Sequence, residues 1–502
     1  MYEIINSYIN YHPVKTQRGL EILTGLFPYF IILFVIIGSF IVPELVAYLV
    51  IIFNVYWLYR SFQTAINATV GLLNVKATQK TDWMEKLKNL DYRKIKQVII
   101  IPNVKEPVHI LERNIQSLSE QNFPLKNIYV VLAMEARARD TDEVKTREMI
   151  KKFKGKFAGI LVTWHDLKPG ETIGKHSNNT SSAKEVKRLL VDERHINIKN
   201  ILVTTCDVDI VFPKQYFSLL TYKFLTTPNK YHRFFQAPFF MYNNVNRLPA
   251  LMRLRILMSG VGYLATLQKV SGRFMSFSTY SVSLDLLDTV GYWDVDVIPE
   301  DWHINLKSYF ALRGDVDIIP LNLPVLGNAP ESTSAWKTFK GTYQTEKRWA
   351  WGVVDVPYVV KKFFQHPEIS FWDRLKKVTL TMEWHITWSS SWFLITLGAT
   401  IPTILNPAFA ATSLGYNLPR MSSLILTVCM VGLITMVLYG NLLNPHNKTT
   451  KSKILAFLHP LTFLQMVTLP IFGLLLGALP GLESQTRLML GKYIGYRVAD
   501  KV

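Results

Sequence analysis

Apolar residues are concentrated at the two ends of this chain, and the middle has the composition of an ordinary globular domain. Residues 26–42 and 45–58 form two apolar runs, each of which approaches the ~20 residues that a helix needs to cross a bilayer. Residues 388–405, 421–443 and 454–482 form three more runs near the other end. This pattern predicts a globular domain inserted between two groups of transmembrane helices.

The basic residues of the chain flank its apolar runs. Lys15 and Arg18 precede the first pair of runs and Arg60 follows it, so the globular middle is predicted to face the cytoplasm, in a multi-pass protein of the plasma membrane. This distribution accounts for the formal net charge of +19 better than nucleic-acid binding does. Pro470 and Pro480 interrupt the last run, which either crosses once or is broken and returns. The side of the basic tail therefore stays open.

A mixture of basic and aromatic side chains precedes the C-terminal runs. It is typical of a helix that lies in the membrane surface, with Trp384 and Trp388 at the level of the lipid headgroups. The alternative is a soluble amphipathic helix packed on the globular domain. The chain is thus divided into an N-terminal hairpin with its connector, a cytoplasmic globular domain, this surface helix, and a C-terminal membrane region with a basic tail: residues 1–92, 93–361, 362–386 and 387–502.

Short apolar segments alternate with helical patterns through the globular middle. The expected elements, in chain order, are a strand at 97–102, a helix at 110–119, strands at 127–134 and 159–164, a helix at 183–190 and a strand at 200–205. This alternation predicts an α/β domain with a mostly parallel, Rossmann-like sheet and right-handed crossovers. Ligands of such sheets bind at the carboxyl ends of the strands.

Acidic side chains follow three of these strands. Asp207 and Asp209 come just after the fourth strand, Glu106 follows the first, and Glu135 ends the second. In an extended stretch the carboxylates of an Asp-X-Asp pair lie on one face, and such oxygen ligands suit Mg²⁺ or Mn²⁺ shared with substrate phosphates. An isolated pair of this kind is more often a turn or a surface feature. Several acids on one rim indicate a metal and nucleoside-diphosphate site.

Two further polar segments lie downstream. Glu300 and Asp301 open a helix that ends near Gly314. They either complement the helix N-terminus or supply a general base that deprotonates an acceptor hydroxyl. Arg348 offers bidentate donors to a diphosphate, and Trp349 offers a flat face to a sugar. The alternative for this pair is an aromatic and basic belt at a membrane interface.

The order of these segments resembles that of membrane-integral family 2 glycosyltransferases with a GT-A catalytic fold, in the layout of cellulose, hyaluronan and chitin synthases. The resemblance covers roughly residues 95–352, and the flanking apolar runs agree with it. The segments that carry it are, in order, IPNVKEP, GKHSNN, CDVD, RFFQAP, VGYWDVDVIPED and KRW. Their joint order and spacing are far more specific than any one of them.

This resemblance implies an inverting glycosyltransferase that uses a UDP- or GDP-sugar and a glycan or lipid-linked acceptor at the bilayer. It assigns a divalent metal, Mg²⁺ or Mn²⁺, to Asp207 and Asp209, and the catalytic base to Asp301, beside Glu300. The reaction implied is a direct displacement, without the covalent intermediate of a retaining hydrolase. The nucleotide is assigned to Glu106, Glu135 and Lys175, and the diphosphate and acceptor end to Arg348, Trp349 and Gln344.

Three departures limit what the resemblance implies. Gln344 precedes Arg348 by four residues, where the family has three. The second strand ends in Ala133-Met134-Glu135, where family members commonly show Asp-Asp, so the preference for the nucleotide base stays open. The apolar runs are few, so processive polysaccharide synthesis with export and single-sugar transfer are both compatible with the sequence.

Other classes of protein share part of this pattern. A catalytically silent membrane scaffold would keep the fold, but both the Asp-X-Asp and the Glu-Asp pair are retained. A transporter fits poorly, because the polar middle is large and most apolar runs lack charged residues. Zinc is not expected, because His165, His176 and His303 lack ligand spacing. The segment 278–281 either contacts the acceptor or fills a polar loop.

Overall fold

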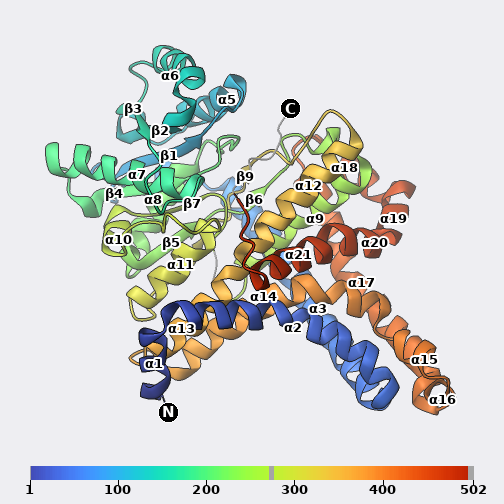
Figure 1. Ribbon diagram of the computed structural model, residues 1–502. Coiled ribbons are helices and arrows are strands. Elements are labelled where there is room, and N and C mark those ends of the chain that lie inside the picture. The colour runs from blue at the N-terminus through green and yellow to red at the C-terminus, as the bar shows by residue number, and fades with distance from the viewer. Residues whose placement is uncertain (1, 271–275, 496–502) are drawn as a thin grey trace.

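The structure of the chain is a computed structural model that describes residues 2–270 and 276–495. A globular domain lies on a layer of long helices that come from both ends of the chain (Figure 1). The N-terminal group consists of α1 (Tyr2–Tyr11), α2 (Pro13–Ile41) and α3 (Pro43–Lys80). The domain is therefore inserted between N-terminal and C-terminal helices in space as well as in sequence.

One seven-stranded sheet forms the core of the globular domain. Its strands are β1 (Lys96–Asn103), β2 (Ile128–Glu135), β3 (Gly159–His165), β4 (Ile201–Thr205), β5 (Arg233–Gln236), β7 (Tyr280–Ser283) and β8 (Asp317–Pro320). They are ordered β3-β2-β1-β4-β7-β5-β8. All neighbours pair in parallel except β7, which is antiparallel to both β4 and β5. The predicted, mostly parallel α/β sheet is confirmed.

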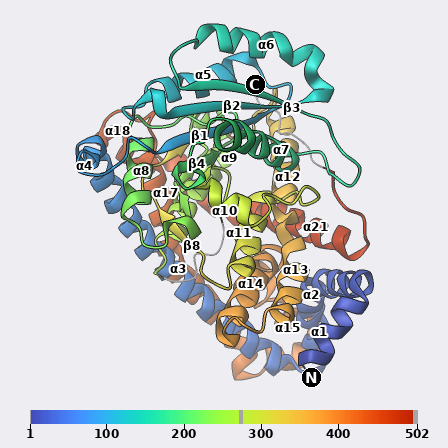
Figure 2. The ribbon, with the colours of Figure 1, turned by 90° about the vertical axis from the view of Figure 1, so that its left-hand side faces the viewer.

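The four strands predicted from sequence are found within one residue at each end. Their apolar runs are nearly continuous because both faces of the sheet are covered, and Val98 to Ile101 are fully buried. In Figure 2, α5 (Val108–Ser119) and α6 (Arg139–Lys152) lie on one side of β1 to β3, and α7 (Lys175–Lys187) lies on the other. The helix expected at 183–190 thus begins earlier than predicted.

A second, two-stranded sheet fixes the loop that follows β4. It consists of β6 (Phe239–Phe240) and β9 (Val325–Leu326), paired in parallel. Val211 N donates to Leu326 O at 2.7 Å, and Leu326 N donates to Val211 O at 3.1 Å. The acidic segment after β4 is therefore held by the strand before it and by this bridge after it.

Within the described ranges, four helices are long and apolar enough to cross a membrane: α2, α3, α9 (Ala250–Leu267) and α17 (Ser413–Leu443). A fifth candidate is the pair of α19 (Pro460–Val467) and the segment Leu469–Met489, which meet at a bend of 53°. The two N-terminal runs and the second C-terminal run fall in α2, α3 and α17. By length and composition, these helices associate the chain with a membrane.

The sequence did not single out α9 as a membrane helix, and its surroundings differ from those of the other three. Half of its apolar window is buried within the protein, against 22%, 22% and 17% for α2, α3 and α17. A Cβ at Gly71 of α3 would come within 2.6 Å of Leu264, and a Cβ at Gly440 of α17 within 2.9 Å of Leu257. These glycines let both long helices approach α9 closely.

The C-terminal region begins differently from the prediction. The run expected to span at 388–405 is divided between α14 (Phe371–Leu397) and α15 (Ile401–Leu405), and neither is among the helices that pass as spans. The stretch predicted as a separate surface helix, residues 362–386, covers the end of α13 (Asp355–Gln365) and the first part of α14, which continues unbroken past residue 386. Polar side chains such as His385 and Ser389 are buried along α14, so this helix packs against other parts of the protein. These polar residues make α14 less apolar than the helices that pass as spans.

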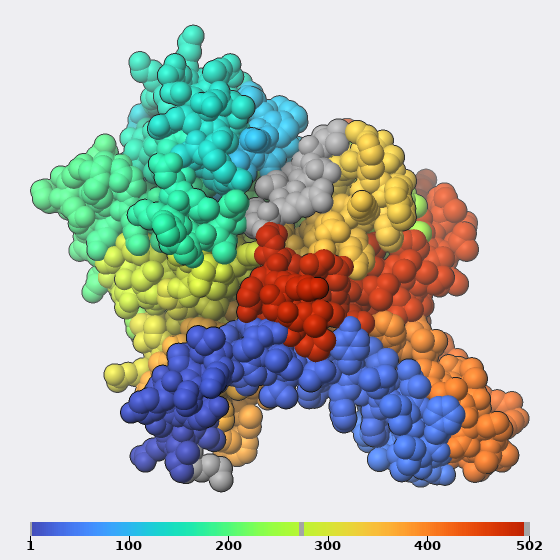
Figure 3. Space-filling model, in the orientation of Figure 1, coloured from blue at the N-terminus to red at the C-terminus, as the bar shows by residue number. Residues whose placement is uncertain are grey.

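The last helix, α21 (Leu479–Met489), lies between the globular domain and α2, and its surface is visible there in Figure 3. Ser484 Oγ of α21 donates to Lys347 O at 2.7 Å, and Arg18 of α2 donates to the carbonyl of Leu488 at 2.7 Å. Arg497 and Lys501 of the predicted basic tail lie outside the described residues. The four-part division of the chain stays a prediction.

Candidate active site

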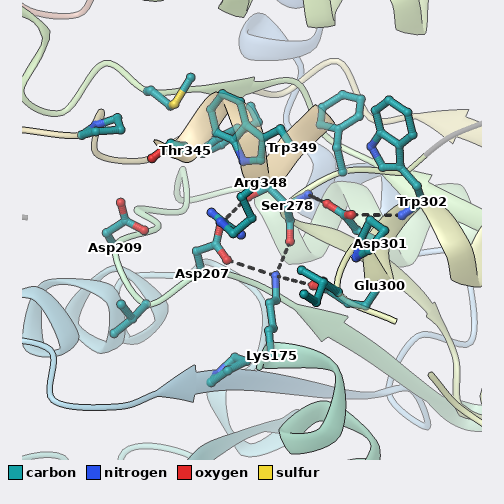
Figure 4. A pocket seen from close by; sticks show the side chains of 18 of the residues that line it. Lys175, Asp207, Asp209, Ser278, Glu300, Asp301, Trp302, Thr345, Arg348 and Trp349 are labelled. Atoms are coloured by element: carbon teal, nitrogen blue, oxygen red, sulfur yellow. Dashed lines mark hydrogen bonds and ion pairs between the residues drawn. The ribbon is translucent and has the colours of Figure 1, made fainter. Parts of the chain in front are cut away.

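One cleft at the carboxyl ends of β1, β2 and β4 brings together almost all of the residues that the sequence singled out (Figure 4). Its lining includes Glu106, Glu135, Lys175, Asp207, Asp209, Glu300, Asp301, Arg348 and Trp349. Gln344 is the one expected residue that lies outside this lining. The structure thus gathers the candidates in one place, while their individual roles stay predictions.

Lys175 is the buried cation at the centre of the cleft. Its Nζ lies 3.1 Å from Asp207 Oδ1 and 3.6 Å from Glu300 Oε1, and it donates to the Ser278 carbonyl at 2.8 Å. Burial alone would lower the pKa of this amine. The carboxylates of Asp207, Glu300 and Asp301 outweigh burial and raise the pKa of Lys175 above its usual value. The amine therefore stays charged among the acids.

The Asp-X-Asp segment is a turn and not the extended stretch that the sequence led us to expect. The chain turns at residues 208–209, past the end of β4, so the alternation of side chains along a strand does not apply. Asp207 Oδ2 accepts a hydrogen bond from Ser278 Oγ at 2.8 Å, whereas Asp209 Oδ2 accepts one from Asn328 N at 2.7 Å. Asp207 is 38% exposed at its side chain, and Asp209 is 2% exposed.

These two carboxylates fit a hard divalent cation by their chemistry. Among the residues that the structure describes, no group of three or more His, Cys, Asp and Glu side chains is arranged to hold a metal. Two carboxylates that share an ion with phosphate oxygens and water are a common arrangement for Mg²⁺. Asp207 and Asp209 are therefore the residues that would hold such an ion, with Asp207 more open to solvent.

Glu300 and Asp301 open α11 (Glu300–Ala311), as predicted. Asp301 Oδ1 accepts from the amide of the next residue at 3.0 Å, and Oδ2 accepts from Ser278 N at 2.9 Å, so two backbone amides fix this carboxylate. Burial raises the pKa of Asp301 above its usual value. Burial, followed by the charge of Asp301, raises the pKa of Glu300. A raised pKa makes a carboxylate a better proton acceptor near neutral pH.

Ser278 joins these charged groups, although the sequence did not distinguish it from a loop residue. Its hydroxyl donates to Asp207, its amide donates to Asp301, and its carbonyl accepts from Lys175. Its φ is 52°, in the left-handed region that residues other than glycine rarely adopt. Contacts to three charged side chains hold this conformation, which is a form of backbone strain often found in active sites.

Glu106 and Glu135 line one end of the cleft, together with Asn103. A buried ion pair of α6, Asp142 with Lys145 at 3.0 Å, fastens the loop after β1. Lys145 Nζ donates to Asn103 Oδ1 at 2.8 Å and to Glu106 O at 3.0 Å. Glu106 therefore lies on a braced loop, whereas Glu135 ends β2 and its carboxylate pairs with Arg137. Carboxylates at this end suit the N–H and O–H donors of a nucleoside.

Helix α12 (Ala335–Ala350) brings Arg348 and Trp349 into the cleft. An ion pair between the buried Glu346 and the half-buried Arg255 of α9 holds its last turn in place. Residues three apart share a face of a helix, so Thr345, three before Arg348, also lines the cleft. Thr345 thus occupies the place of the family's glutamine, and the expectation for Gln344 is not supported by its position.

The other end of the cleft is aromatic. Trp302 of α11, Trp349 of α12, and Trp384 and Trp388 of α14 line it. The rings of Trp302 and Trp384 lie 5.7 Å apart at 74°, and those of Trp384 and Trp388 lie 6.5 Å apart at 80°. The sequence indicated a place at the lipid headgroups for the two tryptophans of α14. Their contribution to the cleft was missed, because it depends on the tertiary packing of α14.

Solved structures of several glycosyltransferases resemble the chain only distantly. PcManGT, a mannosyltransferase from Pyrobaculum calidifontis in complex with GDP-Man and Mn²⁺, is 14% identical with a TM-score of 0.43, over 80% of this chain and 100% of that one. S. aureus TarS 1-349 in complex with UDP-GlcNAc is 14% identical with a TM-score of 0.37, over 81% and 95%. At these low TM-scores, neither likeness carries information about function. No curated protein matches the sequence.

The family model described as Glycosyl transferase family group 2 matches residues 202–442. The matched segment begins in β4 and includes the Asp-X-Asp turn, Ser278, the two acids of α11 and the Arg-Trp pair of α12. It therefore covers most of the charged groups of the cleft and the half of the sheet from β4 to β8, whereas β1, β2 and β3 precede it. By this match and this site, residues 202–442 resemble glycosyl transferase family group 2, and the protein is a glycosyltransferase.

Proposed function

We propose that the protein transfers a sugar, with inversion at the anomeric carbon, from a nucleoside-diphosphate sugar to an acceptor held beside the membrane. The observation that carries this proposal is the hydrogen-bond arrangement around Ser278, which joins Asp301 on one side to Asp207 and Lys175 on the other. Ser278 thereby links the proposed proton acceptor, Asp301, directly to the charged groups that would bind the sugar donor. A sugar bound between them would meet both.

Asp301 is the proposed base. It takes the proton of the acceptor hydroxyl while that oxygen bonds to the anomeric carbon and the nucleoside diphosphate leaves. Its orientation is fixed in advance by two backbone amides, so little reorganisation is needed when the acceptor binds. A direct displacement needs one base, whereas a covalent route needs a carboxylate nucleophile as well. Glu300 is proposed to hold Lys175 in place, 3.6 Å away.

The charged groups on the Asp207 side are proposed to receive the diphosphate. Lys175 supplies a permanent positive charge, and Arg348 supplies paired N–H donors that match phosphate oxygens. A divalent cation held by Asp207 and Asp209 would neutralise charge on the leaving diphosphate. The nucleoside is proposed to lie toward Glu106 and Glu135, with UDP- and GDP-sugars as the two donor classes to test.

The position of the aromatic end favours an acceptor that is handled at the membrane. Glu383 precedes Trp384 on α14 and forms an ion pair with Arg60 of α3, a helix apolar enough to span a bilayer. Tyr56 Oη also donates to Glu383 at 2.5 Å. The aromatic end thus lies next to Arg60, which follows the apolar part of α3, residues 45–58. A glycan or lipid-linked acceptor that extends from the bilayer would reach it.

The test is to incubate the detergent-purified protein with a panel of UDP- and GDP-sugars, Mn²⁺ and a membrane lipid extract, and to measure nucleoside diphosphate release and the product. We expect one donor class to be used. Asp301→Asn should abolish transfer and leave the affinity for the nucleotide unchanged. Product length distinguishes a processive polymerase from a single-sugar transferase. Residence in the plasma membrane with a cytoplasmic domain is tested separately by protease protection in sealed vesicles.

Asp140→Asn is the matched control, because Asp140 is an exposed carboxylate on α6, away from the cleft lining. It should transfer at the wild-type rate. Full activity of Asp301→Asn would refute the base assignment. Absence of transfer with every donor would favour the catalytically silent scaffold.

A further inference from the structure

His303 lies behind the cleft, in the first turn of α11, two residues after Asp301. It is buried, with 4% of its surface exposed, and it is not among the residues that line the cleft. Its Nδ1 lies 2.6 Å from Asp355 Oδ1, and its Nε2 lies 2.9 Å from Asp294 Oδ2. Both ring nitrogens therefore face a carboxylate, an arrangement in which the doubly protonated imidazolium donates twice.

The surroundings of His303 hold it in this charged form. Burial alone would lower the pKa of the imidazole, but the charges of Asp355 and Asp294 outweigh it and raise the pKa of His303 to about 9. Lys307, one turn further along α11, lies 2.5 Å from Asp294, and the ring of Tyr358 lies 4.4 Å from the imidazole ring. Within the described chain, Asp355 Oδ2 has no hydrogen-bond partner, so Asp355 depends on His303 for its counterion.

The two carboxylates belong to segments that matter to the cleft. Asp294 lies in the loop that leads into α11. Asp355 begins α13 (Asp355–Gln365), which follows α12 after the single turn Trp351–Val354. The His303–Asp355 bond therefore connects α11, which carries Asp301 in its first turn, to the turn that follows α12, the helix of Arg348.

We propose that His303 is a positioning residue, which keeps Asp301 aligned with Arg348 and Trp349 by bridging Asp294 and Asp355. The inference rests on the proposed function, because that function gives these three residues their roles. Asp301 is itself fixed by amides of α11 and of Ser278, so a shift of α11 relative to α12 would move the base away from the diphosphate and acceptor end. Displacements of about 1 Å can cost about 10²-fold in rate even when the mutated residue is remote from the chemistry.

The test uses His303→Gln, Asp355→Asn and the double variant. Removal of His303 alone leaves a buried carboxylate without its counterion, so the single variant is at risk of misfolding. The double variant removes both charges, and Asp294 keeps Lys307 as a partner, so the fold should survive. We expect kcat of the folded double variant to fall about 10²-fold and KM for the donor to change less than about threefold. The two single effects on kcat should not add, because both break the same bridge.

The matched control is the pair His232 and Asp315, with Nδ1 2.8 Å from Oδ2. It lies at the amino ends of β5 and β8, on the side of the sheet opposite the cleft. His232→Gln/Asp315→Asn should keep the wild-type kcat. A folded double variant of His303 and Asp355 with wild-type kcat, or additive effects of its single changes, would overturn the inference while the wild type stays active. An inactive wild type would overturn the proposed function and this inference with it.

Discussion

The two ends of the cleft are built from different kinds of structure. At one end, the last residue of β2 and the loops that follow β1 and β4 present Glu135, Glu106 and Asp207. At the other end, helices α12 and α14 present Trp349 and Trp384. Charged groups a few ångströms apart would bind a ligand at the first end. Contact with the faces and edges of aromatic rings would bind it at the second end. Substitutions at one end should therefore leave binding at the other end unchanged, and the predictions below test that independence.

The largest effect is expected from Asp207→Asn at the charged end. This change removes a carboxylate that pairs with Lys175 and accepts from Ser278, and it leaves Asp209 as the single carboxylate of the Asp-X-Asp segment. Transfer at saturating donor and Mn²⁺ should fall about 10³-fold, as when other fixed electrostatic groups are removed from active sites. Nucleoside diphosphate release measures the rate, and binding of an acceptor fragment should be unchanged.

The control for this change is Asp288→Asn in α10 (Leu284–Thr289). Asp288 also forms an ion pair with a lysine, because its Oδ2 lies 2.7 Å from Lys187 Nζ. It lies outside the cleft lining. It should keep transfer within about twofold, as is usual for surface positions. If Asp207→Asn weakened acceptor binding as much as transfer, the two ends would not be independent.

A smaller loss of transfer, about 10²-fold, is expected from Lys175→Met, because one charge-stabilising group is removed and the acids remain. The acids around Lys175 would lose their buried counterion, so the variant should also unfold at a lower temperature than the wild type. Added Mn²⁺ should raise the Tm of the variant more than that of the wild type, because the ion replaces the missing positive charge. Thermal unfolding with and without Mn²⁺ measures this difference. Lys187→Met, which breaks a half-buried pair outside the cleft, should show no such response to the metal.

The charged end was largely predictable from sequence, and the reasons are physical. Buried parallel strands are continuous apolar runs, so their carboxyl ends can be located to within a residue, and Asp207 falls just past one of them. The turn at the Asp-X-Asp segment was not predictable, because Asp209 is held by Asn328, 119 residues further along the chain. The role of Ser278 stayed open in the sequence, because two of its three contacts use its backbone amide and carbonyl, which every residue possesses.

The aromatic end was predictable only in part. Trp349 is marked by its neighbour Arg348 and by the spacing from the acids of α11. Trp384 and Trp388 carry no such mark, since a tryptophan before an apolar run has the same sequence context whether it faces lipid or a cleft. The outcome depends on α14, whose buried polar face packs against other helices and carries both rings into the cleft wall.

Trp384→Ala tests the aromatic end. The ring contacts Trp302 and Trp388, and its loss should raise KM for the acceptor about tenfold, as is common when a buried aromatic group of a binding site is truncated. The affinity for the donor nucleotide, measured by calorimetry, should not change. Trp372→Ala on the same helix is the matched control, because that ring is 73% exposed, and it should leave both constants unchanged. A loss of nucleotide affinity in Trp384→Ala would contradict the separation of the two ends.

The smallest effect separates two neighbours on α12. Gln344 lies outside the cleft lining and Thr345 lies within it, so Gln344→Ala should keep transfer within about twofold. Thr345→Leu, which enlarges a side chain that is only 6% exposed, should crowd Arg348 one turn away and raise KM for the donor more than Gln344→Ala does. Steady-state kinetics of both variants measure the difference. If Gln344→Ala were the more damaging of the two, the face of α12 that carries Gln344, and not the face that carries Thr345, would meet the substrate. The helix geometry would then describe this part of the site less well than the assignment of Gln344 from the family resemblance.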